Sequence, residues 1–382
     1  MNILNVISSL GLSLGGGNAE RTFQLSRFLA TQQNIECTVL TLKIDLDDSR
    51  ISALRPSKVV LLTCLWRRYY LPFGGLLSIR KEVLKSDIIH LIGHWSILNL
   101  LVYLVARLVN KPYVVCPAGA LPLFGRSSLK KRFYNFVFGR DIIKNANGWI
   151  AVTSDELSHF EEYGIPPSKV FIIPNGVNEN DFLVADENQF RLRYKLTNTP
   201  FLLFMGRLNL IKGPDLLLQA FIRVQHLFPD YHLVFAGPDQ GLLHILKNDA
   251  RNAGVIERVH FLGHISNIEK TSAYRCARLL VVPSRHEAMS IVAIEAGICG
   301  TSILITDQCG FDEVKTIDPS WVVSASVSGL EEGITELLKD EKKLKNLSKS
   351  WYDLVKKNYS WNIIIKHYLN LYDKLCKENN ST

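Results

Sequence analysis

Two carboxylates in the second half of the chain have positions that point to a polar ligand. Glu287 lies in a predicted turn after the apolar run Leu279–Val282, and Glu295 follows eight positions later, inside an apolar helical pattern that ends at Gly300. A carboxylate within an apolar helix is costly unless a partner or ligand supplies hydrogen-bond donors. Ser290 is placed to cap this helix. Glu295 is therefore the residue whose presence most needs explaining.

Two cations occupy a second predicted strand-turn-helix unit. Arg207 and Lys212 follow the apolar run Phe201–Met205 and precede a helix that we expect to begin near Pro214. The first turn of a helix favours anions, and an Arg fork beside a Lys point charge suits a diphosphate. Either cation alone could be a solvated loop residue. The pair at the carboxyl end of a strand favours an anion site.

A run of glycines near the start of the chain offers a third contact for phosphate. Gly15, Gly16 and Gly17 follow the predicted strand Ile3–Ile7 and precede a helical pattern. Glycines let a ligand approach the backbone, and the first N–H groups of a helix favour phosphate. The spacing is not Gly-x-Gly-x-x-Gly, so a dinucleotide fingerprint is not supported. Taken alone, the run is as consistent with a tight turn as with a ligand cradle.

The elements that must position these residues alternate between strand and helix. Two such series are separated by a turn-rich junction at residues 174–178, and each predicts a parallel sheet with helices on both faces. At 382 residues, two α/β domains are expected. We place them at residues 1–175 and 176–360, with 178–199 as a polar linker and a C-terminal helix at about 361–378 that packs back on the first domain. The predicted strands are 3–7, 37–42, 59–62, 88–92, 113–116, 149–152, 170–173, 201–205, 232–236, 259–262, 279–282 and 302–305.

Composition narrows the range of partners. The formal charge is +8 and the pI is about 9.0, which fits anionic partners such as nucleotides, phosphates or acidic membranes. No nucleic-acid recognition motif accompanies the charge. The seven cysteines show no Cys-x-x-Cys spacing, so buried thiols are expected rather than disulfides or metal ligands. The apolar stretch Leu91–Val109 contains His94, Asn99 and Arg107, which argues against a membrane span. Because Met1 leads directly into a strand without a basic leader, we expect a cytoplasmic protein.

Six motifs in order resemble one enzyme family. They are Gly-Gly-Gly-Asn-Ala-Glu, Ile-Pro-Asn-Gly-Val-Asn, Gly-Arg-Leu-Asn-Leu-Ile-Lys-Gly, Phe-Ala-Gly-Pro-Asp, Phe-Leu-Gly-His and Pro-Ser-Arg-His-Glu-Ala-Met-Ser-Ile-Val-Ala-Ile-Glu-Ala. Together they look like the signature of the family 4 retaining glycosyltransferases, which use nucleotide-sugar donors. The resemblance covers almost the whole chain. It implies the GT-B fold: two doubly wound, Rossmann-like α/β domains that face a central cleft.

The resemblance also implies a role for each candidate in the second domain. Glu287 would bond the hydroxyls of the donor sugar, and Glu295 would bond the ribose of the nucleotide. Arg207 and Lys212 would hold the diphosphate and neutralise the charge that develops on it, a task that needs no metal and no other cofactor.

Backbone groups would complete the diphosphate site. The resemblance implies that N–H groups around Met289, Ser290 and Ile291 cradle the diphosphate. Gly16 and Gly17 would face it from the first domain.

The chain departs from the family at one position. Many members carry a His after the middle strand of the first domain, where this chain has Ala118. His94, after the neighbouring strand, is the nearest replacement on the acceptor side, although a His beside Trp95 is more often a packed structural residue. Retention without an obvious nucleophile suits front-face attack, in which the leaving phosphate helps to deprotonate the acceptor.

Two segments of the first domain combine aromatic and basic side chains, Trp66–Tyr70 and Lys130–Arg140. In the second, Phe133, Phe136 and Val137 recur at helical spacing. This pattern is typical of an interfacial helix on anionic lipid, and equally of core packing with a solvated basic face.

The sequence thus predicts a retaining glycosyltransferase (EC 2.4) on the inner face of the cell membrane. Its acceptor would be a saccharide or lipid-linked saccharide, in the synthesis of cell-surface polysaccharide or glycolipid. Two alternatives stay open: a nucleotide-sugar epimerase on the same fold, and a non-catalytic nucleotide-sugar-binding partner subunit.

Overall fold

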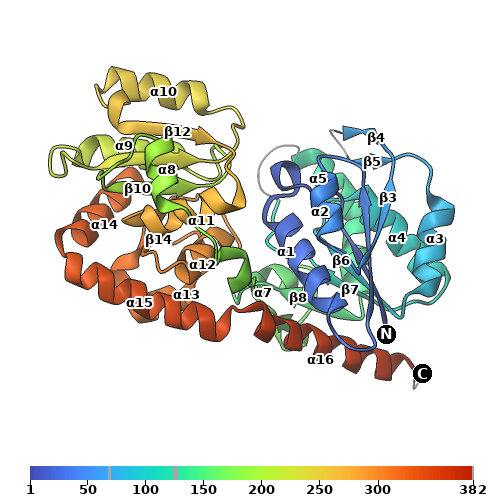
Figure 1. Ribbon diagram of the computed structural model, residues 1–382. Helices are drawn as coiled ribbons and strands as arrows, with labels where there is room; N and C mark the ends of the chain where they lie inside the picture. Colours follow the sequence, from blue (N-terminus) through green and yellow to red (C-terminus); the bar gives the residue numbers. More distant parts are fainter. Residues whose placement is uncertain (68–69, 124–127, 381–382) are drawn as a thin grey trace. The chain divides into compact units, whose positions relative to one another are not determined.

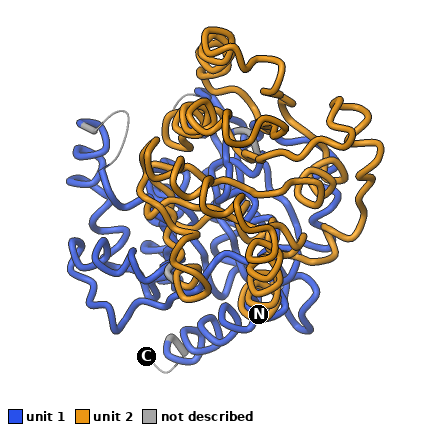
Figure 2. The backbone as a smooth tube through the Cα atoms, turned by 90° about the vertical axis from the view of Figure 1, so that its left-hand side faces the viewer, with its two compact units in different colours: residues 1–176, 361–382 blue, residues 177–360 orange. Residues whose placement is uncertain are grey.

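The computed structural model describes residues 1–67, 70–123 and 128–380. The chain forms two compact units (Figure 2): one comprises Met1–Gly176 and Trp361–Thr382, and the other Val177–Ser360. In each unit every strand of the main sheet pairs in parallel with its neighbours, with helices on both faces (Figure 1). Both units therefore have the doubly wound α/β architecture of the GT-B fold. Among the described residues, no helix is long and apolar enough to cross a membrane.

The sheet of unit 1 has seven strands in the order β3-β2-β1-β6-β7-β8-β9. Its strands are β1 Asn2–Val6, β2 Glu36–Leu42, β3 Lys58–Leu62, β6 Ile88–Ile92, β7 Tyr113–Cys116, β8 Gly148–Ala151 and β9 Val170–Ile172. Its helices are α1 Leu12–Ala30, α2 Asp48–Ser52, α3 Leu76–Lys85, α4 Ile97–Leu108, α5 Ser128–Tyr134, α6 Arg140–Lys144, α7 Glu156–Glu161 and α16 Trp361–Asn380. Strands β6 and β7 are buried along their whole length, as expected for central strands covered on both faces.

The sheet of unit 2 has six strands in the order β12-β11-β10-β13-β14-β15. Its strands are β10 Phe201–Met205, β11 His232–Ala236, β12 Val259–Gly263, β13 Leu279–Val282, β14 Ile303–Thr306 and β15 Val322–Val323. Its helices are α8 Glu187–Arg193, α9 Pro214–Val224, α10 Leu243–Asn252, α11 Asn267–Cys276, α12 Ile291–Ile298, α13 Asp312–Ile317, α14 Val327–Lys339 and α15 Glu341–Asn358.

The strand orders explain where candidate residues meet. In unit 2 the chain runs outward from β10 to β12 and then returns to place β13 on the other side of β10. In unit 1 the same reversal lies between β1 and β6. The loops that follow the two strands beside such a reversal begin next to each other at the carboxyl edge of the sheet. In unit 2 these are the loops that carry Lys212 and Glu287.

The structure corrects three expectations about local structure. Residues 178–199 are not simply a linker, because they contain α8, whose Phe190 is buried in unit 2. The glycine run is not a loop before the helix: α1 begins at Leu12 and contains a kink at Gly16, which has φ 55° and ψ −136°. The helix expected over Lys130–Arg140 is interrupted by a π-helical turn at Asn135–Gly139. A short antiparallel hairpin of β4 Cys64–Trp66 and β5 Leu71–Pro72 was not predicted.

Helix α16 belongs to unit 1, where it packs against α1 (Figure 1). The buried guanidinium of Arg21 donates to the Tyr368 hydroxyl, to Asn175 Oδ1 and to the Ile173 carbonyl, at distances between 2.6 and 2.9 Å. One cation thus joins α1, the segment that leads out of unit 1 and α16. Neutral acceptors satisfy its donors, as a buried charge requires.

Candidate functional site

An ion pair lies at the carboxyl ends of β10 and β13. Lys212 Nζ donates to Glu287 Oε1 at 2.6 Å, and Ser284 Oγ donates to Glu287 Oε2 at 2.9 Å. The Lys212 side chain is 24% exposed and that of Glu287 is 13% exposed, so both can still be reached by a ligand. The Glu287 amide donates to the Gln308 carbonyl and fixes the turn. The structure therefore brings together two residues that lie 75 positions apart in the chain.

Close backbone packing between the two loops creates this geometry. Gly213, with φ +68°, ends the first loop, and a Cβ at this position would lie 2.0 Å from the Pro283 carbonyl oxygen. The Arg285 amide donates to the Ile211 carbonyl at 2.8 Å. The Arg285 guanidinium also makes a bidentate pair with Asp215 at 2.8 and 2.6 Å. Arg285 thus cross-links the two loops.

Arg207 lies in the same loop as Lys212. Its side chain is partly buried, and its guanidinium makes no hydrogen bond or ion pair with the described part of the chain. A partly buried guanidinium without an internal acceptor can bind an anion without first breaking an existing pair.

The start of α12 holds the expected backbone donors. Met289 and Ser290 are buried, and Ile291 is partly buried and opens the helix. Ser290 occupies the N-cap position, but its hydroxyl does not cap the helix, which differs from the prediction. The buried Ser290 Oγ has no hydrogen-bond partner among the described residues. An unpaired buried hydroxyl beside the first N–H groups of a helix is a further polar contact for an anion.

Glu295 has partners within the protein. Its side chain is 7% exposed; Lys270 Nζ donates to Oε1 at 2.8 Å, and the Tyr274 hydroxyl donates to Oε2 at 2.7 Å. These two donors satisfy the buried carboxylate, so its presence in an apolar helix does not by itself require a ligand. Sequence analysis missed Lys270 and Tyr274, whose spacing of four residues on α11 was the available signal.

Gly16 and Gly17 lie in unit 1, at the beginning of α1. Gly16 is partly buried and Gly17 is exposed. The positive φ of Gly16 breaks the helix, so the backbone there differs from regular helix. The Leu14 amide, just before the run, donates to Asp45 Oδ2 at 3.0 Å.

His94 is a packed residue in unit 1. It is 3% exposed, its ring contacts those of Trp95 and Tyr134, and its Nε2 lies 3.4 Å from Asn135 Oδ1 in the π-helical turn. Burial lowers the pKa of His94 to about 4, which the Asn135 hydrogen bond only partly offsets. At neutral pH it is therefore an uncharged core side chain, without direct access to solvent.

The turn at Ala118 is held by a buried carboxylate that sequence analysis missed. Ala118 has φ +48°, an uncommon conformation for a residue with a side chain. Glu156 accepts from the Gly119 amide at 2.6 Å and from the Val152 amide at 2.8 Å. It joins the loops that follow β7 and β8, and burial raises its pKa.

The two segments with aromatic and basic residues differ in how far the structure describes them. In Trp66–Tyr70, Trp66 is 55% exposed, whereas Arg68 and Tyr69 lie outside the described residues. In Lys130–Arg140, Phe133 is 69% exposed and Phe136 is 86% exposed. These two rings are therefore not core residues.

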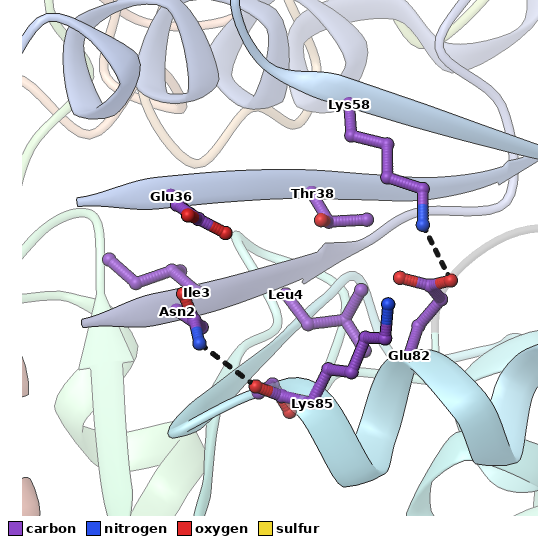
Figure 3. Close-up of a pocket in the computed structure, with 9 residues that line it drawn as sticks. Asn2, Ile3, Leu4, Glu36, Thr38, Lys58, Glu82 and Lys85 are labelled. Carbon is purple, nitrogen blue, oxygen red and sulfur yellow. Dashed lines mark hydrogen bonds and ion pairs between the residues drawn. The ribbon is translucent and has the colours of Figure 1, made fainter.

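A hollow of about 200 Å³ lies in unit 1 at the amino ends of β1, β2 and β3 (Figure 3). Two internal contacts lie at its wall: Lys58 Nζ donates to Glu82 Oε1 at 2.6 Å, and Asn2 Nδ2 donates to the Lys85 carbonyl at 3.2 Å. It lies at the opposite end of the sheet from the glycine run and contains none of the predicted site residues. Elsewhere in the described chain, no three His, Cys, Asp or Glu residues are grouped as metal ligands would be.

Two family models match the chain in tandem. Residues 15–181 match the model described as Glycosyltransferase Family 4, and residues 186–353 match Glycosyl transferases group 1. The two models together span most of the chain. The chain belongs to the family 4 glycosyltransferases. Lys212, Glu287 and Glu295 lie within the second match, and Gly16, Gly17 and His94 lie within the first.

Curated relatives of this chain match over part of their length. D-inositol 3-phosphate glycosyltransferase 1 of Catenulispora acidiphila is 34% identical over 199 residues, which is 50% of this chain and 46% of the relative. An uncharacterized glycosyltransferase of Methanocaldococcus jannaschii is 28% identical over 221 residues, or 55% of each chain. The chain therefore spans about half the length of the curated relatives it matches.

Solved structures share the fold of this chain. The HepE protein of Anabaena, solved in complex with UDP and glucose, has a TM-score of 0.80 at 17% identity, covering 98% of this chain and 100% of that one. WaaG, a glycosyltransferase involved in lipopolysaccharide biosynthesis, has a TM-score of 0.66 at 15% identity, covering 95% and 98%.

Proposed function

We propose that this chain is a retaining glycosyltransferase that transfers a sugar from a nucleoside diphosphate-sugar to a saccharide or lipid-linked saccharide. The observation that carries the proposal is the Lys212–Glu287 pair at the strand reversal of unit 2. An ammonium and a carboxylate with residual exposure offer one group for phosphate and one for sugar hydroxyls. Family membership supports the same assignment.

The donor would be held by residues of three kinds. Lys212 and Arg207 would bind the diphosphate, together with the N–H groups of Met289, Ser290 and Ile291 and the unpaired Ser290 hydroxyl. Glu287 would accept hydrogen bonds from the transferred sugar, and Glu295 from the ribose. Gly16 and Gly17 would contribute backbone contacts to the diphosphate from unit 1.

The chemistry would be a front-face substitution. The acceptor hydroxyl oxygen forms a bond to the anomeric carbon while the bond from that carbon to the phosphate oxygen breaks. The electron pair leaves with the nucleoside diphosphate, whose phosphate oxygen takes the acceptor's proton. Arg207 and Lys212 stabilise the charge that grows on this leaving group, because fixed cations act most strongly where charge develops. His94 is buried and neutral, so this scheme gives it a structural role.

We propose that the enzyme binds its acceptor at an anionic membrane surface, on the cytoplasmic face. The support is the exposed pair Phe133 and Phe136 beside Lys130 and Lys131, since apolar rings flanked by lysines suit the interface of acidic lipid. Liposome flotation tests this. Phe133→Ser with Phe136→Ser should reduce binding to acidic vesicles several-fold, whereas Leu192→Ser, at a 70% exposed site in unit 2, should not. Equal binding by both proteins would contradict the membrane contact.

The donor proposal is tested by thermal stabilisation with UDP-, GDP-, ADP- and dTDP-sugars. A ligand at 100 times its Kd adds about 2.7 kcal/mol to the free energy of unfolding. At least one donor should stabilise the protein, and Lys212→Met and Glu287→Gln should reduce this response. The matched control is Lys343→Met, which removes a lysine that is also ion-paired and 32% exposed. A wild-type protein that responds to none of the donors would refute the donor site.

Product analysis then separates the alternatives. Transfer that requires an added acceptor supports the glycosyltransferase. An epimerised or hydrolysed sugar formed without acceptor would indicate the epimerase. Donor binding without turnover over a broad acceptor panel would indicate a non-catalytic partner subunit, for which the Ala118 substitution is the favouring observation.

A further inference from the structure

The two oxygens of Glu295 are both engaged by one face of α11. Lys270 and Tyr274 lie four positions apart, so their side chains project from the same side of the helix. Lys270 holds Oε1 and Tyr274 holds Oε2. Two contacts on separate oxygens fix the rotation of the carboxylate about its last bond. Glu295 is therefore set in one orientation before any ligand arrives.

The two donors differ in access to solvent. Tyr274 is fully buried, whereas the Lys270 side chain remains 24% exposed. A ligand would accordingly approach the carboxylate on its Lys270 side. An ionised carboxylate has about four lone-pair positions, and two internal donors leave capacity for ligand hydroxyls. The arrangement keeps Glu295 an acceptor, because both neighbours donate to it.

The Lys270 ammonium also lies over an aromatic ring. Its ammonium lies 5.1 Å from the centroid of the Phe182 ring, and that ring is itself packed near Tyr274, with centroids 6.4 Å apart. A cation over an aromatic face is attracted by the ring quadrupole. Lys270 thus offsets the charge of the buried Glu295 carboxylate while remaining partly exposed to solvent.

We propose that Lys270 and Tyr274 are positioning residues, which hold the Glu295 carboxylate in the orientation that binds the hydroxyls of the donor ribose. Through this contact the enzyme selects ribonucleotides over 2′-deoxyribonucleotides. This inference rests on the proposed function, in which Glu295 binds the ribose. Tyr274 sets the orientation of the carboxylate. Lys270 holds the other carboxylate oxygen and supplies positive charge beside the bound nucleotide.

The test is the ratio of affinities for a nucleoside diphosphate and its 2′-deoxy form. Calorimetry with UDP, GDP, ADP and dTDP first identifies a binding diphosphate, and the 2′-deoxy form of a ribonucleotide that binds is then measured. A hydrogen bond to a charged group should make the ribose form bind roughly tenfold or more tightly to the wild-type protein. Glu295→Gln should bring the ratio close to one. Tyr274→Phe and Lys270→Met should each reduce it at least threefold.

The ratio separates positioning from general structural damage. A variant that merely loosens unit 2 would weaken both nucleotides alike and leave the ratio unchanged. Tyr274→Phe removes a buried hydroxyl and could lower stability, but Lys270→Met changes a partly exposed side chain and keeps its apolar stem. Lys343→Met, the ion-paired control, should leave the ratio at its wild-type value.

The outcomes are distinct for the two proposals. If none of UDP, GDP, ADP and dTDP binds the wild-type protein, the donor function fails, and this inference fails with it. If dTDP binds and the three ribonucleotides do not, the donor function stands and the selection of ribonucleotides is refuted. If a diphosphate binds and the ratio is unchanged in both Lys270→Met and Tyr274→Phe, the donor function stands and the positioning role is refuted.

Discussion

Replacement of Gly213 by alanine should test whether backbone contact between the two loops creates the Lys212–Glu287 site. The added Cβ would lie 2.0 Å from the Pro283 carbonyl oxygen, and the backbone has φ +68°, where L-residues are strained. Relief of the contact requires the loops to separate by about 1 Å or more, since a carbon and an oxygen not bonded to each other do not approach so closely. Lys212 adjoins Gly213, and Glu287 lies four residues after Pro283, so the separation would reach the ion pair.

A second glycine separates the free-energy cost of the steric collision from the cost of the backbone strain. Gly254 has φ +69°, but a Cβ added there would have no heavy atom within 4 Å, so Gly254→Ala carries the conformational strain without the collision. That strain costs about 1 kcal/mol, because a left-handed conformation costs about 1–2 kcal/mol and the reduced freedom of the unfolded chain offsets part of it. Gly213→Ala should cost roughly 2–4 kcal/mol more, from backbone displacement and weakened loop hydrogen bonds of about 1 kcal/mol each.

The assay is urea unfolding of both variants together with donor binding. Gly213→Ala should have the lower urea midpoint and should bind the donor at least tenfold more weakly, since a shift of about 1 Å in a binding group can cost that much. Gly254→Ala should bind the donor normally. Equal destabilisation by the two substitutions, or unchanged donor affinity in Gly213→Ala, would refute the idea that this contact sets the site.

Three further predictions concern the framework around the site. The folded-state pKa of His94, about 4, lies below its ordinary value of 6.5, so the stability tied to the neutral imidazole is complete above pH 6.5 and is lost as the pH falls toward 4. The wild-type protein should therefore lose unfolding free energy between pH 7 and pH 5, and His94→Phe should make that loss smaller by about 2 kcal/mol. The same loss in His94→Phe and in the wild-type protein would contradict this. Arg21→Met should destabilise unit 1 by roughly 3 kcal/mol in urea unfolding, because it leaves Tyr368 and other buried partners unpaired, and a cost below about 0.5 kcal/mol would argue against the network. Trp351→Phe should cost about 2 kcal/mol or more by the same measurement, through a cavity and loss of the hydrogen bond to the Ala293 carbonyl, and should leave the stability of unit 1 unchanged.

Buried strands were predictable because they are continuous apolar runs bounded by turns. All twelve predicted strands correspond to strands of the two parallel sheets. Shorter strands have too few residues to show a hydrophobic pattern in the sequence: β4 has three residues and β5 has two. Helix α8 was missed because, of its seven residues, only Phe190 is buried, so the rest of the segment looks like a polar linker. The π-helical turn at Asn135–Gly139 lies against His94, which is distant in the sequence, and no local pattern specifies that contact.

The same limit applies to the candidate site. Residue type and strand position were enough to predict that Lys212 belongs to a polar site at a strand end, and the strand reversal explains why Glu287 lies beside it. The partners of Glu295 and Arg285 depend on which helices pack together. Lys270 and Asp215 come from helices elsewhere in the sequence, and their contacts emerge only when those helices pack.

The course of the chain through the two units has a consequence for synthesis on the ribosome. Unit 2 is one continuous segment whose ends adjoin, as Val177 pairs with Ser360, so it can fold as soon as it has emerged. Unit 1 is made first but needs α16, which supplies the fully buried Ile364, Tyr368 and Tyr372 to its core. The unit that begins emerging first is therefore completed last. Until then its α16-facing surface is exposed, and that waiting period is when nascent chains should be most prone to aggregation or chaperone binding.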